Sequence, residues 1–274
     1  MKATARLAAE SRPDGTTRLT ALAGQAPLLL RQTLADGADP GVAQVHLVAG
    51  AAGPVGGDEL HLGQHLAAGA RVRVRSVAAT VALPGPGLGS SPGTWNGSSS
   101  SSSSSESTLD ISVRLDSGSA LVWDPQPFIA AQGARHRTTV RVELAADARL
   151  TWHEQTLLGR HGEEPGSAVT RLCVRRAGRP LLDHTLAVGP RHPGSLGPAV
   201  AGPDRAGSTT VIVDPDWEQV PPADRLTLDP RDDAHGAVAV FPLDGPAVVI
   251  SALSSDGLGL ERLHRAVRHR VGLL

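Results

Sequence analysis

The segment LDISVRLD at residues 109–116 decides the fold. Aliphatic side chains occupy every second position, and Asp, Ser, Arg and Asp occupy the positions between them. Successive side chains of a β-strand point to opposite faces of the sheet, so this period of two predicts a half-buried strand.

The same alternation recurs along the chain. It is seen around Val72 and Val74, Val140 and Val142, and Leu172 and Val174, and apolar runs follow at 209–213, 237–241 and 247–253. Between two such strands, residues 176–179 (RAGR) favour a hairpin, because Gly178 tolerates a positive φ. We therefore expect a mainly β protein, a single large β-rich domain of stacked sheets with few helices that spans residues 1–274.

A helix is predicted at the C-terminal end. Apolar residues recur there at spacings of three and four, after the possible capping residues 254–256 (SSD); they are Leu260, Leu263, Val267 and Val271. This spacing indicates an amphipathic helix.

Residues 84–107 interrupt the strand pattern. They are rich in Pro, Gly and Ser and include a run of serines at 98–105. Such a segment has few side chains with which to bury surface, so we expect a disordered loop inserted within the domain, joining neighbouring strands of one sheet.

Composition excludes several classes of protein. The formal net charge is −1, which does not suit a nucleic-acid-binding protein. No apolar stretch is long enough for a membrane span. A single cysteine, Cys173, and the lack of an apolar leader at residues 1–10 favour a cytoplasmic location.

The Gly-rich segment at residues 50–58 follows an apolar strand but is not a phosphate-binding loop, because no Lys-Ser/Thr pair follows it and Pro54 has no N–H. The local interpretation is a tight turn at Gly56 and Gly57, with Asp58 accepting backbone hydrogen bonds. A functional role for Asp58 stays open.

The chain contains 11 histidines, which raises the possibility of a metal site. His61 and His65 would share one face of a strand or helix, and His153 precedes a glutamate, but no characteristic ligand spacing surrounds them. A β-sheet metal-dependent hydrolase that uses these three histidines is the alternative function. A β-rich module that binds a small ligand is a weaker alternative, because exposed aromatic residues are few.

Several moderately specific motifs occur in a characteristic order. They are VGGD at 55–58, RSVAAT at 75–80, LVWDPQP at 121–127, QGA at 132–134, VEL at 142–144, WHE at 152–154 and LGRHGE at 158–163. In this order they resemble the UreD (UreH) family of urease accessory proteins. The resemblance is good over residues 26–182 and looser elsewhere.

The resemblance implies a non-catalytic, β-rich scaffold that binds the accessory protein UreF and apo-urease. Through UreF it would engage the GTPase UreG, and nickel would pass along an internal water-filled route. It implies no enzymatic activity and no tightly bound cofactor, with nickel only in transit.

The matching motif positions supply candidate residues. Three acidic residues are candidates for lining or shaping the nickel route: Asp58, Glu143 and Glu163. Four further residues are expected to support the structure: Gly56, Gly57, Arg160 and Gly162. Scattered ligands of this kind suit an ion that must move on, since a closed cluster of strong ligands would hold nickel too firmly.

Overall fold

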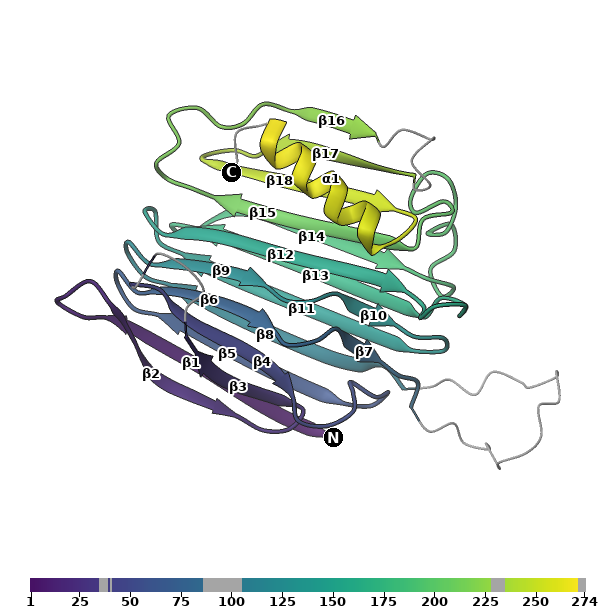
Figure 1. The fold of residues 1–274 in the computed structure, drawn as a ribbon, viewed down its shortest axis with the longest axis horizontal. Coiled ribbons are helices and arrows are strands. Elements are labelled where there is room, and N and C mark those ends of the chain that lie inside the picture. The colour runs from purple at the N-terminus through teal and green to yellow at the C-terminus, as the bar shows by residue number, and fades with distance from the viewer. Residues whose placement is uncertain (35–38, 40, 86–104, 228–234, 271–274) are drawn as a thin grey trace.

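The computed structural model describes residues 1–34, 39, 41–85, 105–227 and 235–270, which form two large stacked β-sheets and one helix (Figure 1). Sheet A has seven strands in the order β14-β13-β11-β8-β5-β1-β2. Their bounds are β1 Lys2–Ser11, β2 Thr17–Gly24, β5 Glu59–Leu66, β8 Ser107–Leu115, β11 Arg135–Leu144, β13 Ser167–Arg176 and β14 Arg179–Val188. The mainly β fold that the sequence predicts is confirmed.

Sheet B has eleven strands. Nine follow the order β16-β17-β18-β15-β12-β9-β6-β4-β3, and the short strand β10 pairs with β12 and with β7. Their bounds are β3 Leu28–Thr33, β4 Ala43–Ala49, β6 Arg71–Ser76, β7 Thr80–Ala82, β9 Ala120–Asp124, β10 Phe128–Ala130, β12 Arg149–Leu158, β15 Ala206–Val213, β16 Asp224–Thr227, β17 Gly236–Pro242 and β18 Ala247–Ser254.

The central part of the chain winds between the two sheets. Strands β4, β6, β9 and β12 are parallel neighbours in sheet B, and β5, β8, β11 and β13 are parallel neighbours in sheet A. Parallel neighbours need a long crossover connection. Here each crossover of one sheet contains a strand of the other, so the inner faces of both sheets are built together, coil by coil.

The inner faces form the main core. On β8, Ile111, Val113 and Leu115 are buried, as the alternation predicts. Trp123 of β9 and Trp152 of β12 stack with ring centroids 4.7 Å apart and planes 4° apart, and Trp152 is fully buried. These two indoles supply bulk that the small aliphatic residues of the core cannot.

The predicted hairpin at residues 176–179 is confirmed. Strands β13 and β14 are antiparallel, and the turn between them has positive φ at Ala177 (50°) and Gly178 (74°). Two positive φ values in succession are what a two-residue hairpin turn of type I′ requires.

The expected place of the loop at residues 84–107 is wrong in one respect. The strand before it, β7, belongs to sheet B, and the strand after it, β8, belongs to sheet A, so the segment connects two sheets. Ser107 is already a buried residue of β8. Residues 86–104, on which the expectation of disorder rests, lie outside the described residues.

The helix α1 (Gly257–Arg270) packs against β15–β18 on the outer face of sheet B (Figure 1). Its buried face carries Leu260, Leu263 and Val267, while Val271 lies outside the described residues. Asp256 caps the helix, because its Oδ1 accepts a hydrogen bond from Gly259 N–H at 2.8 Å. None of the helical structure described is long and apolar enough to cross a membrane.

Candidate functional site

A cavity of about 330 Å³ lies between the two sheets. Its walls come from β5, β8, β11 and β13 of sheet A and from β3, β4, β6, β7, β9, β10 and β12 of sheet B. Most of the lining is apolar, with a few polar side chains among it; these include Thr138, His136, Gln126, Gln155 and Glu154. The cavity therefore has room for several waters and few groups that could hold an ion.

Glu154 is the acidic residue in this lining. It lies two positions after Trp152 on β12, so both side chains face the interior. Burial raises the pKa of the Glu154 carboxyl to about 7, and the neighbouring Trp152 indole opposes this shift in part. A carboxyl with this pKa is divided between its charged and neutral forms near neutral pH.

Two smaller cavities, each of about 20 Å³, lie next to the large one and share lining residues. The first shares Glu154, Thr156 and Thr170 with the large cavity, and the second shares Thr156 and Leu186 with the first. Each is large enough for about one water molecule. The three cavities form a row between the sheets that runs from β4 and β5 to β14 and β15.

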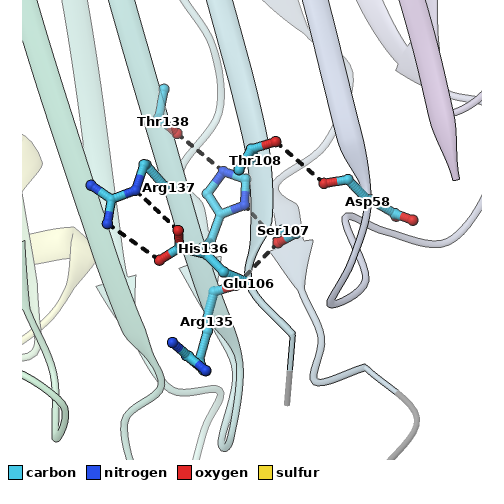
Figure 2. A network of polar contacts seen from close by, with 8 residues as sticks. All are labelled: Asp58, Glu106, Ser107, Thr108, Arg135, His136, Arg137 and Thr138. Atoms are coloured by element: carbon cyan, nitrogen blue, oxygen red, sulfur yellow. Dashed lines mark hydrogen bonds and ion pairs between the residues drawn. The ribbon is translucent and has the colours of Figure 1, made fainter. Parts of the chain in front are cut away.

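His136 of β11 is a second titratable group in the large cavity. Its Nδ1 lies 2.8 Å from Ser107 Oγ, and its Nε2 lies 3.1 Å from Thr138 Oγ1 (Figure 2). The ring also stacks on Phe128 at 4.6 Å. Burial lowers the pKa of His136 to about 4, so the ring is neutral at pH 7 and each nitrogen has a hydroxyl partner.

Replacing Ser107 by alanine is expected to lower the free energy of unfolding by about 1–3 kcal/mol, because a buried ring nitrogen of His136 loses its partner. Chemical denaturation of the full chain measures the effect. Ser112→Ala, at an exposed position of the same strand, is the matched control and should change stability by less than about 0.5 kcal/mol. Equal effects of the two substitutions would contradict this account.

The turn at residues 53–58 borders the large cavity through Gly53 and Pro54. Asp58 is 4% exposed and is not part of the lining; its Oδ2 accepts a hydrogen bond from Val55 N–H at 2.8 Å, and its other oxygen binds the Met1 amino group. Asp58 thus holds the turn together, as the sequence predicts for its backbone contacts.

The two glycines of this turn are required for different reasons. Gly57 has a φ of 92°, in the region that favours glycine. Gly56 has no such φ, but a Cβ there would lie 2.5 Å from Gly85 N and from Ser105 O, so glycine allows the backbones to approach closely.

The other two acidic candidates lie away from the large cavity. Glu143 is on the outer face of sheet A, where it pairs with Arg175 at 3.3 Å and is 57% exposed. Glu163 lies in the turn after β12, where it accepts a hydrogen bond from Arg160 N–H at 3.0 Å and pairs with the Arg160 guanidinium. These contacts lower the pKa of Glu163 to about 2. In the same turn, Gly162 has a φ of 74°.

The three histidines of the alternative metal site do not come together. His61 and His65 are exposed on the outer face of β5 in sheet A, each near an aspartate, and His153 is buried on β12 in sheet B. Within the described part of the chain, no group of three or more His, Cys, Asp or Glu residues could hold a metal ion.

His153 instead pairs with a histidine of the C-terminal helix. Its ring meets that of His264 edge-on at 4.9 Å. His153 Nδ1 lies 2.6 Å from Thr210 Oγ1, and His264 Nε2 lies 2.6 Å from Ser208 Oγ. Burial lowers the pKa to about 4 for His153 and about 3 for His264, so both rings are neutral at pH 7.

The sequence of the chain matches a known protein family. The family description that matches is UreD urease accessory protein, and the match spans residues 1–272. The chain belongs to the UreD family. It is 39% identical to a urease accessory protein UreD of Streptomyces coelicolor and to one of Streptomyces avermitilis, in each case over 96% of this chain and 94% of the relative. It is 40% identical to a urease accessory protein UreD 3 of Streptomyces griseus, over 93% of this chain and 91% of the relative.

As a member of the UreD family the chain is related to accessory proteins and not to catalytic enzymes.

Within the UreD fold, sequence reasoning missed Glu154 and His136 as cavity residues. Glu154 carried a usable signal, because it shares its strand face with Trp152, and a charged residue on an apolar face is unusual. His136 carried none, since its environment depends on a hydroxyl from another strand.

Proposed function

We propose that this chain is a cytoplasmic scaffold for urease maturation that binds UreF and apo-urease and acts with the GTPase UreG. In this role it catalyses no bond change. Nickel passes through the row of cavities between the two sheets on its way to the urease active site. The observation that carries the proposal is this row of cavities, with Glu154 as the acidic group facing it.

The chemistry of the lining suits transfer better than storage. Nickel binds firmly to clusters of imidazole, thiolate or carboxylate ligands, and firm binding would stop its movement. The large cavity offers one carboxyl group, a neutral imidazole and scattered hydroxyl and amide oxygens. An ion can keep most of its water there, which avoids the large cost of bare charge in a protein interior.

The pKa of Glu154 adds a means of release. Near neutral pH an arriving cation favours the carboxylate form and displaces a proton, and the departing cation lets the proton return. The attraction is therefore weaker than that of a permanently charged carboxylate, because deprotonating the buried group costs free energy.

Co-expression and co-purification test the scaffold role. The full chain should co-purify with UreF, and the pair should recruit UreG and apo-urease, with an interface of more than about 1,000 Å² for each stable contact. Addition of nickel and GTP to the assembly should then yield active urease. Failure of the folded chain to bind any of these proteins would overturn the proposal.

The alternative hydrolase makes a different prediction about the purified chain. It requires a tightly bound metal in stoichiometric amount, which elemental analysis would detect. The separation of His61 and His65 from His153 disfavours it.

A further inference from the structure

We propose that the large cavity opens to the outer face of sheet B through a slot between interrupted strands, and that the polar pocket outside this slot receives a hydrated divalent cation. This inference rests on the proposed nickel route and names the place where an ion exchanges between that route and the surface. The pairing of the strands defines the slot, and the side chains around the slot define the pocket.

Two neighbouring strands of sheet B are interrupted at the same level. β6 ends at Ser76 and β7 begins at Thr80, while β9 ends at Asp124 and β10 begins at Phe128. β6 pairs with β9, and β7 pairs with β10, so the two interruptions lie side by side. Both interrupted segments, 76–79 and 125–126, line the large cavity.

The next strand, β12, runs past the interruptions without a break. Its pairing with β9 ends at Trp152, and its pairing with β10 begins at Thr156, so residues 153–155 have no ladder partner on that side. Opposite them stand residues 124–127, in which Pro125 and Pro127 have no N–H to donate. The sheet is thus open at this level.

Few backbone groups close the gap. Gln126 N–H donates to Ser76 Oγ at 2.8 Å instead of to a strand, and Thr80 N–H donates to Pro127 O at 3.0 Å. Both bonds join the two interrupted segments to each other, and neither reaches β12. The slot therefore lies between these segments and β12.

A pocket of about 290 Å³ lies outside the slot. Pro125, Gln126 and Gln155 line both this pocket and the large cavity, so the two spaces meet at these residues. Gln155 lies on the same face of β12 as His153, toward helix α1, and its Nε2 is 2.8 Å from His153 Nε2. Gln155 is therefore placed to control the width of the slot.

The charges of the outer pocket favour a cation. Asp124 and Glu261 supply two carboxylates, and Arg75 supplies one guanidinium, whose Nε lies 4.0 Å from Asp124 Oδ2. Glu261 comes from helix α1, so the helix forms one wall. Two carboxylates partly offset by an arginine give a weak site, and the amides of Gln126 and Gln155 can replace water around an ion as it enters.

Tryptophan fluorescence of the full chain tests the slot directly. Trp123 lines the large cavity and stacks on Trp152, so Ni²⁺ inside the cavity should quench their emission. Trp95→Phe and Trp217→Phe provide a background in which the emission comes from this pair. In that background Gln155→Phe should slow quenching by NiCl2 by at least about fivefold, because the ring narrows a passage whose diameter sets entry.

The matched control is Thr151→Phe, which places the same ring on the same face of β12, four residues from Gln155 and away from both spaces. NiCl2 should quench the tryptophan emission of this variant at the same rate as that of the background protein. Equal quenching in Gln155→Phe and the background, or no quenching in the background itself, would overturn the slot.

The charge of the outer pocket is tested with the same signal. Asp124→Asn combined with Glu261→Gln should raise the NiCl2 concentration needed for half-maximal quenching by about tenfold, and Arg75→Gln should lower it. A urease activation assay with the same variants separates the two proposals. If a variant slows quenching but leaves urease activation unchanged, the result supports the slot and counts against the nickel route. If quenching is unchanged, the result overturns the slot, whether or not urease activation changes.

Discussion

Glu154→Gln is expected to leave the protein folded and to lower nickel-dependent urease activation by about 10- to 100-fold, the usual cost of removing a group that supports a metal. The substitution keeps the size and shape of the side chain and removes the only acidic group among the described residues that line the large cavity. The measurement is the rate of activation of apo-urease in the reconstituted assembly. Glu143→Gln, on the exposed outer face of sheet A, is the matched control and should activate at nearly the wild-type rate.

The stability of Glu154→Gln shows whether any loss of activation comes from misfolding. The folded pKa of about 7 lies above the ordinary value of 4.5, so the folded state binds more protons than the unfolded chain between these values. Stability due to this group is therefore complete below pH 4.5 and is lost as pH rises through 7. At pH 8 the glutamine variant should be more stable than the wild type by about 3 kcal/mol. A variant that is destabilised at pH 8 would contradict this view of Glu154.

The strands themselves could be predicted because each carries its own signal. The alternation at 109–115 became β8, and the Gly178 turn became the hairpin of β13 and β14. The spacing of Leu260, Leu263 and Val267 became the buried face of α1. In each case the information lies within a few residues of the feature that it specifies.

The arrangement of the strands could not be predicted in the same way. Strands of sheet A and sheet B both bury one face against the same core, so their alternation is identical and does not say to which sheet a strand belongs. This is why the segment at 84–107 was expected within one sheet, although β7 and β8 lie in different sheets. The winding of the chain between sheets is a property of long-range pairing.

The cavity residues were hidden for a related reason. Glu143 and Glu163 stood in motifs and carried charge, but each has an arginine partner at the surface. Glu154 and His136 come from different sheets, and their meeting in one cavity depends on how the sheets stack. The motif at 152–154 contains Glu154, and the face of the strand decides that Glu154, and not His153, lines the cavity.

Acidification from pH 8 to pH 5 is expected to weaken the attachment of helix α1 and to cost about 2 kcal/mol for each of His153 and His264. Their folded pKa values, about 4 and about 3, lie below the ordinary value of 6.5. Between these folded values and pH 6.5, the unfolded chain therefore binds more protons than the folded chain. Stability from these rings is complete above about pH 6.5 and is lost as pH falls toward 4 and then 3. Denaturation at a series of pH values measures it.

His264→Gln isolates this contribution, because an amide can still meet Ser208 but does not titrate in this range. The fall in unfolding free energy between pH 8 and pH 5 should shrink by about 2 kcal/mol. His269→Gln, at an exposed position of the same helix, should leave the fall unchanged. Glu154 contributes a slope of the opposite sign to the pH dependence of the unfolding free energy in every variant. The difference between variants, and not the total slope, therefore measures the contribution of His264. If the unfolding free energy fell equally between pH 8 and pH 5 in both variants, protonation of His153 and His264 would not be the cause of the acid destabilisation.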